Sequence, residues 1–375
     1  MNEKLQNPFL AQGYVSPEYF CDREKETKEL ENLLQNGWNV TLISPRRMGK
    51  TGLIKNTFYH LREADKSNSY IYVDIFGSKD MHGFVEKLSE AVFDAMLSKG
   101  EKFLKRATQV LSSCRPVIST DSLTGSPSVS VSIEPSSTET TLKSVLGFLK
   151  DSEKQVFIAI DEFQEITYYP EKGLEAGLRS FIQFMPNTHF VFSGSKRHLM
   201  MDMFMSPKRP FYQSTRLMDL KAIAEKNYYR FALKFFKEDG CSLTENVFHK
   251  LYSRFNGHTW YIQVILKILY SWHKHDISVE DVRNAIKEQV VSSTAYYENI
   301  MNLIADKQYE VLKAVAKEHI VKEPTNGKFI HDYQLKSASS VTSAIKALVE
   351  KELLYRTDDG YIVYDRFFSL WLAER

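Results

Sequence analysis

The sequence predicts an α/β core with a mainly parallel sheet, followed by an α-helical region and a terminal unit of helices and a hairpin. Strand-like runs alternate with helical patterns up to residue 218, which is typical of parallel strands joined by helices. One run, Val156–Ile160, is continuously apolar, as in a strand that is buried on both faces of a parallel sheet. We therefore expect three domains, which cover residues 1–218, 219–298 and 299–375.

The composition is that of an ordinary globular protein. Of the 375 residues, 43% are hydrophobic and 26% are charged, and the formal net charge of +2 gives no argument for nucleic acid or membrane as a partner. The three cysteines form no Cys-x-x-Cys pair, which favours reduced thiols over disulfides or metal ligands. No signal segment and no apolar stretch of membrane-spanning length is evident, so the expected location is the cytoplasm.

The most informative stretch joins a β-rich run, Val40–Ile43, to a helical pattern through a short loop. The helix is headed by Gly49, Lys50 and Thr51, so that backbone N–H groups and the helix N-terminus face the loop. This is the P-loop arrangement, in which Lys50 contacts the β- and γ-phosphates of a nucleotide and the Thr51 hydroxyl binds Mg²⁺. The residues expected around the phosphates are Ser44, Pro45, Arg46, Arg47, Met48, Gly49, Lys50, Thr51 and Gly52.

The loop departs from the pattern Gly-x-x-x-x-Gly-Lys-Ser/Thr at its first residue. Ser44 replaces the first glycine and Pro45 follows it. Because proline has no N–H group, the loop offers the phosphates one donor fewer at that point. Arg46 and Arg47 lie inside the loop, where they either contact the phosphates or are solvated.

Two acids directly after the apolar run 156–160 complete the expected site. Asp161 would hold Mg²⁺, mostly through water, and Glu162 would orient or deprotonate the attacking water. We expect the strand that ends at Asp161 to lie next to the phosphate-loop strand. Ser195 closes the following strand. It either has a functional role, in contact with the γ-phosphate or the lytic water, or it belongs to a tight turn and has no such role.

The remaining elements of the core follow from periodicity and capping residues. Asp22 is expected to cap a helix that ends near Asn36 and Gly37. Between residues 112 and 137 the composition shifts to Ser, Thr, Pro and Val, and the alternation over residues 129–133 favours a small β-hairpin over a disordered insert. The other predicted elements are a β-rich run over 69–76, a helix over 81–97, a helix over 173–184 and a strand over 189–192.

The two C-terminal domains have different patterns. Residues 219–298 contain helical patterns only, over 221–237, 245–255, 259–272 and 279–289. We expect residues 219–298 to form a helical lid domain over the nucleotide. His258 heads one of its helices and either donates a hydrogen bond to the phosphates or is a packing residue. In 299–375, a helix over 307–317 precedes a helix capped by Ser339 and Ser340, and Asp359-Gly360 marks a hairpin turn. This order is the outline of a winged helix.

The chain resembles the archaeal-type ATPase family, a branch of the P-loop NTPases related to AAA+ and STAND proteins. The resemblance covers nearly the whole chain. Its most specific part is the string Asp-Glu-Phe-Gln after Ile160. The other matching parts are residues 23–26, 44–51, 193–195, 210–216 and 256–258, together with the terminal winged helix.

The resemblance implies that Lys50 and Thr51 act on phosphate and Mg²⁺, that Asp161 binds Mg²⁺ and that Glu162 is the catalytic base. It also implies that Arg23 and Glu24 lie at the nucleotide side of the core. The sequence departs from the family at Ser44 and at Gly257-His-Thr259, where a proline is expected.

We expect a slow, Mg²⁺-dependent ATPase that acts as a switch: ATP and ADP change the position of the lid and the winged helix, which contacts a protein partner. The alternative is an ATP-gated DNA-binding protein, and a module that binds nucleotide without hydrolysis stays open. Residues 306–375 hold eleven Lys or Arg and eleven Asp or Glu, whereas DNA-binding modules usually show a basic excess. The sequence indicates no oligomeric state and no membrane partner.

Overall fold

The computed structural model describes residues 5–97, 114–120, 127–357 and 359–375. The chain divides into two compact units: a core unit, Gln12–Ile223, and a helical unit formed by Met1–Ala11 and Ala224–Arg375. The N-terminal segment belongs to the helical unit because the buried ring of Phe9 contacts Phe235 and Tyr270 of that unit. The predicted core domain, residues 1–218, includes this segment. The three predicted domain boundaries themselves stay predictions.

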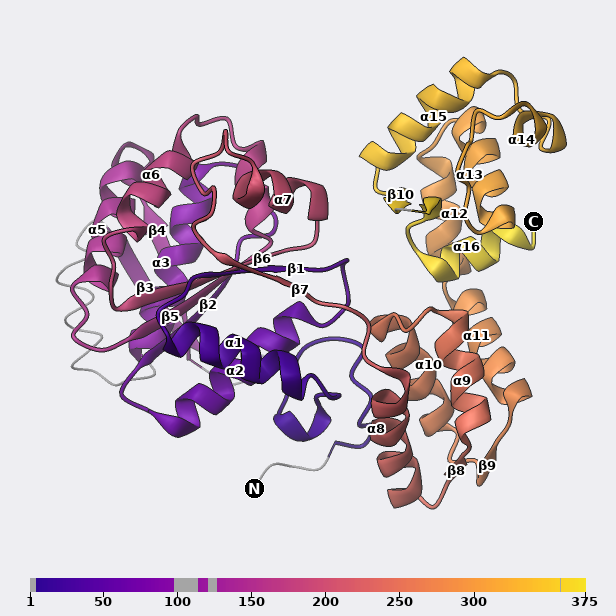
Figure 1. Ribbon diagram of the computed structural model, residues 1–375, viewed down its shortest axis with the longest axis horizontal. Helices are drawn as coiled ribbons and strands as arrows, with labels where there is room; N and C mark the ends of the chain where they lie inside the picture. The colour runs from indigo at the N-terminus through magenta and orange to yellow at the C-terminus, as the bar shows by residue number, and fades with distance from the viewer. Residues whose placement is uncertain (1–4, 98–113, 121–126, 358) are drawn as a thin grey trace. The chain divides into compact units, whose positions relative to one another are not determined.

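The core unit contains a five-stranded parallel sheet in the order β2-β5-β6-β1-β7 (Figure 1). Every residue of the three central strands is buried, as their apolar runs predict. The predicted α/β core with a parallel sheet is thus confirmed. The strands are β1 (Val40–Ile43), β2 (Ser69–Asp74), β5 (Val156–Asp161), β6 (Thr188–Gly194) and β7 (Arg216–Asp219).

The prediction that the strand ending at Asp161 lies next to the phosphate-loop strand is wrong. β6 lies between β5 and β1, and its register with β1 runs from Val40↔Val191 to Ile43↔Gly194. Both strands were recognised from their apolar runs, but the order of strands depends on helical crossovers that these runs do not encode. As a result, the carboxyl end of β6 lies between Asp161 and the phosphate loop.

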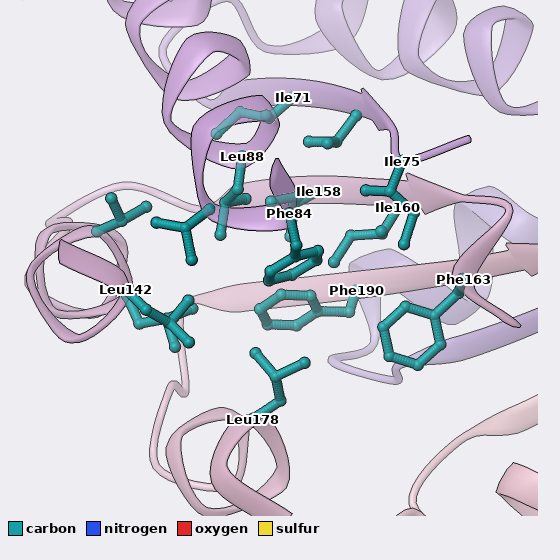
Figure 2. Packing of buried hydrophobic residues seen from close by; sticks show 14 of the residues in the cluster. Ile71, Ile75, Phe84, Leu88, Leu142, Ile158, Ile160, Phe163, Leu178 and Phe190 are labelled. Atoms are coloured by element: carbon teal, nitrogen blue, oxygen red, sulfur yellow. The ribbon is translucent and has the colours of Figure 1, made fainter. Parts of the chain in front are cut away.

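Helices cover both faces of the sheet (Figure 1). Leu30 of α1 and Leu53 of α2 belong to the hydrophobic cluster on one face, with Val40 and Phe157. The opposite cluster joins Phe84 of α3 with sheet residues, and Figure 2 shows its packing. The helices of the core unit are α1 (Glu24–Gln35), α2 (Lys50–Ala64), α3 (Met81–Leu97), α5 (Thr138–Lys150), α6 (Leu174–Ile182) and α7 (Arg197–Met205), with 3₁₀ turns η1 (Pro17–Tyr19), η2 (Pro135–Ser137) and η3 (Phe163–Tyr168).

The predicted β-hairpin is present within the Ser-rich insert. β3 (Cys114–Thr120) and β4 (Pro127–Ile133) pair antiparallel, and residues 112–113 and 121–126 of the predicted insert lie outside the described residues. The backbone N–H of Val129 donates to Asp94 at 3.2 Å and that of Val131 to Glu90 at 3.1 Å. Two carboxylates of α3 thus satisfy donors on the outer edge of β4 and attach the hairpin to the core.

Two predicted helix caps are wrong. Asp22 does not cap α1, which begins at Glu24 after Arg23, and both preceding residues have left-handed backbone with φ of 49° and 72°. In α15 (Ala338–Glu350) the cap is Ser337, whose Oγ accepts from the N–H of Ser340 at 3.3 Å. For α15 the correct residue type was predicted but placed two residues too late, whereas the residue before α1 is Arg23, which makes no side-chain cap bond. The backbone geometry that decides each cap was not visible in the sequence.

The helical unit contains the predicted helices and ends in the winged helix, which confirms that part of the fold class. β10 (Leu354–Thr357) pairs antiparallel with β11 (Gly360–Val363) at the predicted turn. Its other elements are α8 (Glu225–Glu238), β8 (Ser242–Leu243), α9 (Glu245–Arg254), α10 (Thr259–Ser271), β9 (Asp276–Ile277), α11 (Val279–Ser292), α12 (Thr294–Asn302), α13 (Asp306–Glu318), α14 (Gly327–Asp332) and α16 (Arg366–Ala373). Throughout the described part of the chain, no helix has the length and apolar character needed to cross a membrane.

Candidate functional site

The phosphate loop occupies residues 44–49, between the end of β1 and the start of α2. Arg47 and Gly49 have left-handed backbone, with φ of 63° and 97°. Ser44 is fully buried and its hydroxyl donates to the carbonyl of Pro45 at 3.0 Å, and Met48 of the same loop is also buried. This backbone turns the chain sharply from strand to helix, so that the first N–H groups of α2 face the concave side of the loop.

Lys50 holds a buried positive charge at this turn. Its side chain is 5% exposed, and its ammonium donates to the carbonyls of Ser44 at 3.2 Å and Pro45 at 3.5 Å. Among the described residues, no carboxylate forms an ion pair with it. Burial lowers the pKa of Lys50, and the nearby charges of Glu162 and Asp161 oppose this shift. A buried ammonium without an anionic partner in contact suits a phosphate group.

Asp161, at the end of β5, accepts two hydroxyl donors on one oxygen. The Thr51 hydroxyl donates to Oδ2 at 2.7 Å and the Tyr72 hydroxyl donates to the same atom at 2.8 Å. Burial and the neighbouring charge of Asp161 raise the pKa of Tyr72, so its hydroxyl stays a donor. The hydroxyl and carboxylate of Thr51 and Asp161 are oxygen ligands of the kind that Mg²⁺ prefers.

The donor set fits Mg²⁺ bound together with a nucleotide rather than a dedicated metal cage. Nowhere in the described ranges do three His, Cys, Asp or Glu residues group as metal ligands. Mg²⁺ in nucleotide sites needs only one or two protein ligands, because phosphate and water supply the others. The pair Thr51 and Asp161 meets that requirement.

Glu162 is held beside Asp161 by two donors from different elements. Its Oε2 accepts from the Ser195 hydroxyl at 2.6 Å and from the side-chain amide of Gln164 at 2.5 Å. Ser195 follows β6, the strand that separates β5 from β1, and it also accepts from the Arg46 guanidinium at 3.4 Å. The structure therefore brings the predicted residues Glu162, Ser195 and Arg46 together at one edge of the sheet.

Gln164, the last residue of the Asp-Glu-Phe-Gln string, belongs to the same group of side chains, although its type and position alone predict no role for it. It is fully buried, and its approach depends on Gly194 at the end of β6. A Cβ atom at residue 194 would overlap the Gln164 side chain and Met200. Glycine at the end of β6 thus leaves room for the amide that orients Glu162. Gly194 and Gln164 stand next to residues already singled out in the sequence, which is the signal that could have identified them.

Gly52 lies against an aromatic ring of the core. A Cβ atom at this position would approach Phe20 to 2.7 Å, so the glycine permits close packing between α2 and the segment before α1. Its predicted contact with nucleotide stays a prediction.

Arg23 joins the phosphate loop to the end of the core unit. The side chain is 2% exposed, and it donates to the carbonyl of Met48 at 3.2 Å and to the carbonyl of Lys221 at 2.6 Å. It also forms an ion pair with Glu26 at 2.9 Å. These bonds indicate that Arg23 positions the loop. The sequence predicts only that Arg23 lies at the nucleotide side of the core, and not this role.

His258 belongs to the helical unit, where it precedes α10. Its ring contacts that of Tyr261, with 4.7 Å between the centroids. This contact agrees with the alternative prediction that His258 is a packing residue. Its contact with nucleotide stays a prediction.

Comparison with known proteins identifies the family. The model of an ATPase domain predominantly from Archaea matches residues 20–265. The chain belongs to this family. A model of a probable winged helix domain matches residues 295–374 of this archaeal-type ATPase. Among curated proteins, none matches the chain at a significant level.

Solved structures with the same fold include a Walker-type ATPase and two ORC proteins. The Walker-type ATPase of Pyrococcus abyssi is 16% identical, with a TM-score of 0.65 over 97% of this chain and 99% of that chain. The Aeropyrum pernix ORC1 protein, solved in complex with DNA, is 14% identical with a TM-score of 0.55, over 98% of this chain and 96% of that chain. The ADP form of Aeropyrum pernix ORC2 is 15% identical with a TM-score of 0.54, over 98% of both chains. At these identities the likeness shows the fold of the archaeal-type ATPase.

The buried bonds of Arg23 predict a loss of stability when this residue of the ATPase is replaced. Arg23→Ala leaves the carbonyls of Met48 and Lys221 without this donor, and we expect a loss of about 3 kcal/mol in the free energy of unfolding. Arg23→Lys should recover only part of it, because an ammonium lacks the planar fork that reaches both carbonyls. Chemical denaturation measures the loss, with Lys25→Ala on the exposed side of α1 as the control. Equal stability of Arg23→Ala and the wild type would contradict the assigned role.

The lowered pKa of Lys50 predicts a pH dependence of nucleotide binding. In the empty site, part of Lys50 is neutral at an alkaline pH where an ordinary lysine is still charged. Phosphate favours the charged form, so binding should take up a proton there, and affinity should fall as pH rises through the lowered pKa. The same shift makes the empty protein more stable as pH rises from this lowered pKa to that of an ordinary lysine. Calorimetry of ADP binding in buffers of different ionisation enthalpy measures the uptake, and its absence would contradict the prediction.

Proposed function

We propose that this archaeal-type ATPase is a Mg²⁺-dependent switch that hydrolyses ATP slowly. The observation that supports it most is the convergence of Lys50, the Thr51–Asp161 pair and Glu162 at one edge of the sheet. In this proposal Lys50 binds the β- and γ-phosphates, and Thr51 and Asp161 hold Mg²⁺, which neutralises phosphate charge. Glu162, oriented by Ser195 and Gln164, positions or deprotonates the attacking water.

The connection through Arg23 supports coupling between the site and the helical unit. One guanidinium contacts Met48 in the phosphate loop and Lys221, close to the point where the core unit ends at Ile223. A change of the loop on nucleotide binding would therefore alter the segment that leads into the helical unit. In this proposal the ATP and ADP states favour different positions of that unit, which contains the winged helix.

A protein is the partner that the winged helix fits best. The charged residues on the exposed side of α15 are Lys346 and Glu350, so this surface has no basic excess for a phosphate backbone. The alternative is DNA, because ORC1 of Aeropyrum pernix was solved in complex with DNA and shares the fold. We place the activity in the cytoplasm, which the buried free thiols of Cys21, Cys114 and Cys241 support.

ATP turnover and ADP binding, measured with and without duplex DNA at two salt concentrations, test the proposal. We expect Mg²⁺-dependent turnover that DNA does not change. Turnover that rises with DNA, together with tight binding that falls steeply with salt and is lost in Lys346→Glu, would favour the DNA function. Tight binding without turnover would reduce the protein to a nucleotide-binding module.

A further inference from the structure

Tyr72 lies on the strand next to the one that carries Asp161. β2 pairs with β5 in the register Tyr72↔Ala159 and Asp74↔Asp161, so the tyrosine lies two positions before the end of its strand. From there its hydroxyl reaches Oδ2 of Asp161 at 2.8 Å, while the Thr51 hydroxyl reaches the same oxygen at 2.7 Å. The other oxygen, Oδ1, accepts the backbone N–H of Glu162 at 3.0 Å.

These three donors limit what the Asp161 carboxylate can still bind. A carboxylate offers about four acceptor positions, roughly two on each oxygen. Two hydroxyls occupy Oδ2 and one N–H group occupies part of Oδ1, so the remaining position lies on Oδ1. Mg²⁺ sites use such single contacts together with water in octahedral geometry, whereas Ca²⁺ sites commonly include carboxylates that bind through both oxygens.

We propose that Tyr72 is a positioning residue that limits Asp161 to a single-point contact with the cation or its bound water, and so favours Mg²⁺ over Ca²⁺. The proposal rests on the proposed function, because it assigns Asp161 to the cation. Tyr72 is itself held in place, since the ammonium of Lys55 on α2 lies 5.0 Å from the centre of its ring. In the absence of its hydroxyl, an acceptor position on Oδ2 becomes available.

Tyr70 provides a matched control on the same face of the same strand. Its hydroxyl donates to the carbonyls of Leu61 at 2.7 Å and Asp65 at 3.0 Å. The guanidinium carbon of Arg62 lies 5.4 Å from the centre of its ring. The change Tyr70→Phe therefore removes one hydroxyl from β2, as Tyr72→Phe does, but none that contacts Asp161.

The test is a calorimetric titration of the ADP-bound chain with MgCl₂ and with CaCl₂, for the wild type and both variants. We expect Tyr72→Phe to lose about 10-fold in Mg²⁺ affinity, as second-shell changes at metal sites commonly do, with Ca²⁺ affinity unchanged or higher. The ratio of Mg²⁺ to Ca²⁺ affinity should fall in Tyr72→Phe and remain that of the wild type in Tyr70→Phe. A wild-type ratio in Tyr72→Phe, or an equal change in both variants, would overturn the proposal.

A second measurement separates this proposal from the proposed function, because it uses the nucleotide-free chain. Denaturation midpoints of Tyr72→Phe, Asp161→Asn and the double variant form a double-mutant cycle. We expect non-additive shifts, because the two changes act on one hydrogen bond, whereas Tyr70→Phe and Asp161→Asn should add. Additive shifts for Tyr72 and Asp161 would overturn the positioning role. A wild-type chain that does not bind ADP would instead overturn the proposed function, and the cycle would still decide whether Tyr72 holds Asp161.

Discussion

Lys50→Ala is expected to weaken ATP and ADP binding by at least about 100-fold, which corresponds to about 3 kcal/mol. The reason is that its buried ammonium is the positive charge that we propose binds the phosphates. Removal of Lys50 costs the bonds to the carbonyls of Ser44 and Pro45, but because burial lowers the pKa of Lys50, the folded protein also disfavours this charge. These two effects oppose each other, so the stability of the ligand-free chain should change little. A large loss of binding with little change in stability is therefore the expected result.

Calorimetric titration with each nucleotide in the presence of Mg²⁺ measures the loss, and thermal unfolding monitors the fold. Lys66→Ala is the matched control, because Lys66 follows the end of the same helix and its side chain is 76% exposed. Wild-type affinity in Lys50→Ala would show that the phosphates are bound elsewhere.

Glu162→Gln is expected to lower the rate of ATP hydrolysis by about 10²- to 10⁴-fold, the range that a general base contributes, while ATP still binds. A glutamine keeps the size of the side chain and an oxygen that can accept from Ser195 and Gln164. It lacks the negative charge needed to take up a proton from water. The change should therefore separate binding from turnover.

Single-turnover and steady-state rates measure this effect, together with the affinity for ATP. Glu165→Gln is the control, because Glu165 lies in η3, the 3₁₀ turn that begins directly after Glu162, and has no place in the proposed chemistry. If Glu162→Gln hydrolyses ATP at the wild-type rate, Glu162 is not the base, and the two bonds to its carboxylate serve structure only.

The parts of the site that are local in sequence were predictable. Lys50 and Thr51 follow a strand and a loop within one short stretch, and Asp161 and Glu162 directly follow an apolar run. Backbone geometry fixes such neighbours as soon as the strand and helix form. For the same reason the hairpin turn at Asp359-Gly360 was placed correctly.

The contacts that were missed depend on the order of strands and on long-range packing. Tyr72 reaches Asp161 only because β2 pairs with β5, and Ser195 reaches Glu162 only because β6 lies next to β5. Arg23 donates a hydrogen bond to the carbonyl of Lys221, which is 198 residues further along the chain. Alternation of residues shows which side chains share a face, but it does not show which strand lies beside which, and so the predicted neighbour of the phosphate-loop strand was wrong.

In the proposed switch, ATP and ADP favour different positions of the helical unit. The most direct test is the distance between spin labels at Lys66→Cys in the core unit and Arg283→Cys in the helical unit, in the Glu162→Gln background. Both side chains are highly exposed, at 76% and 72%, and the three native cysteines are buried, so labelling should be selective. We predict that the distance distribution of the Mg·ATP state differs from those of the ADP-bound and empty states. Identical distributions in all three states would contradict the switch.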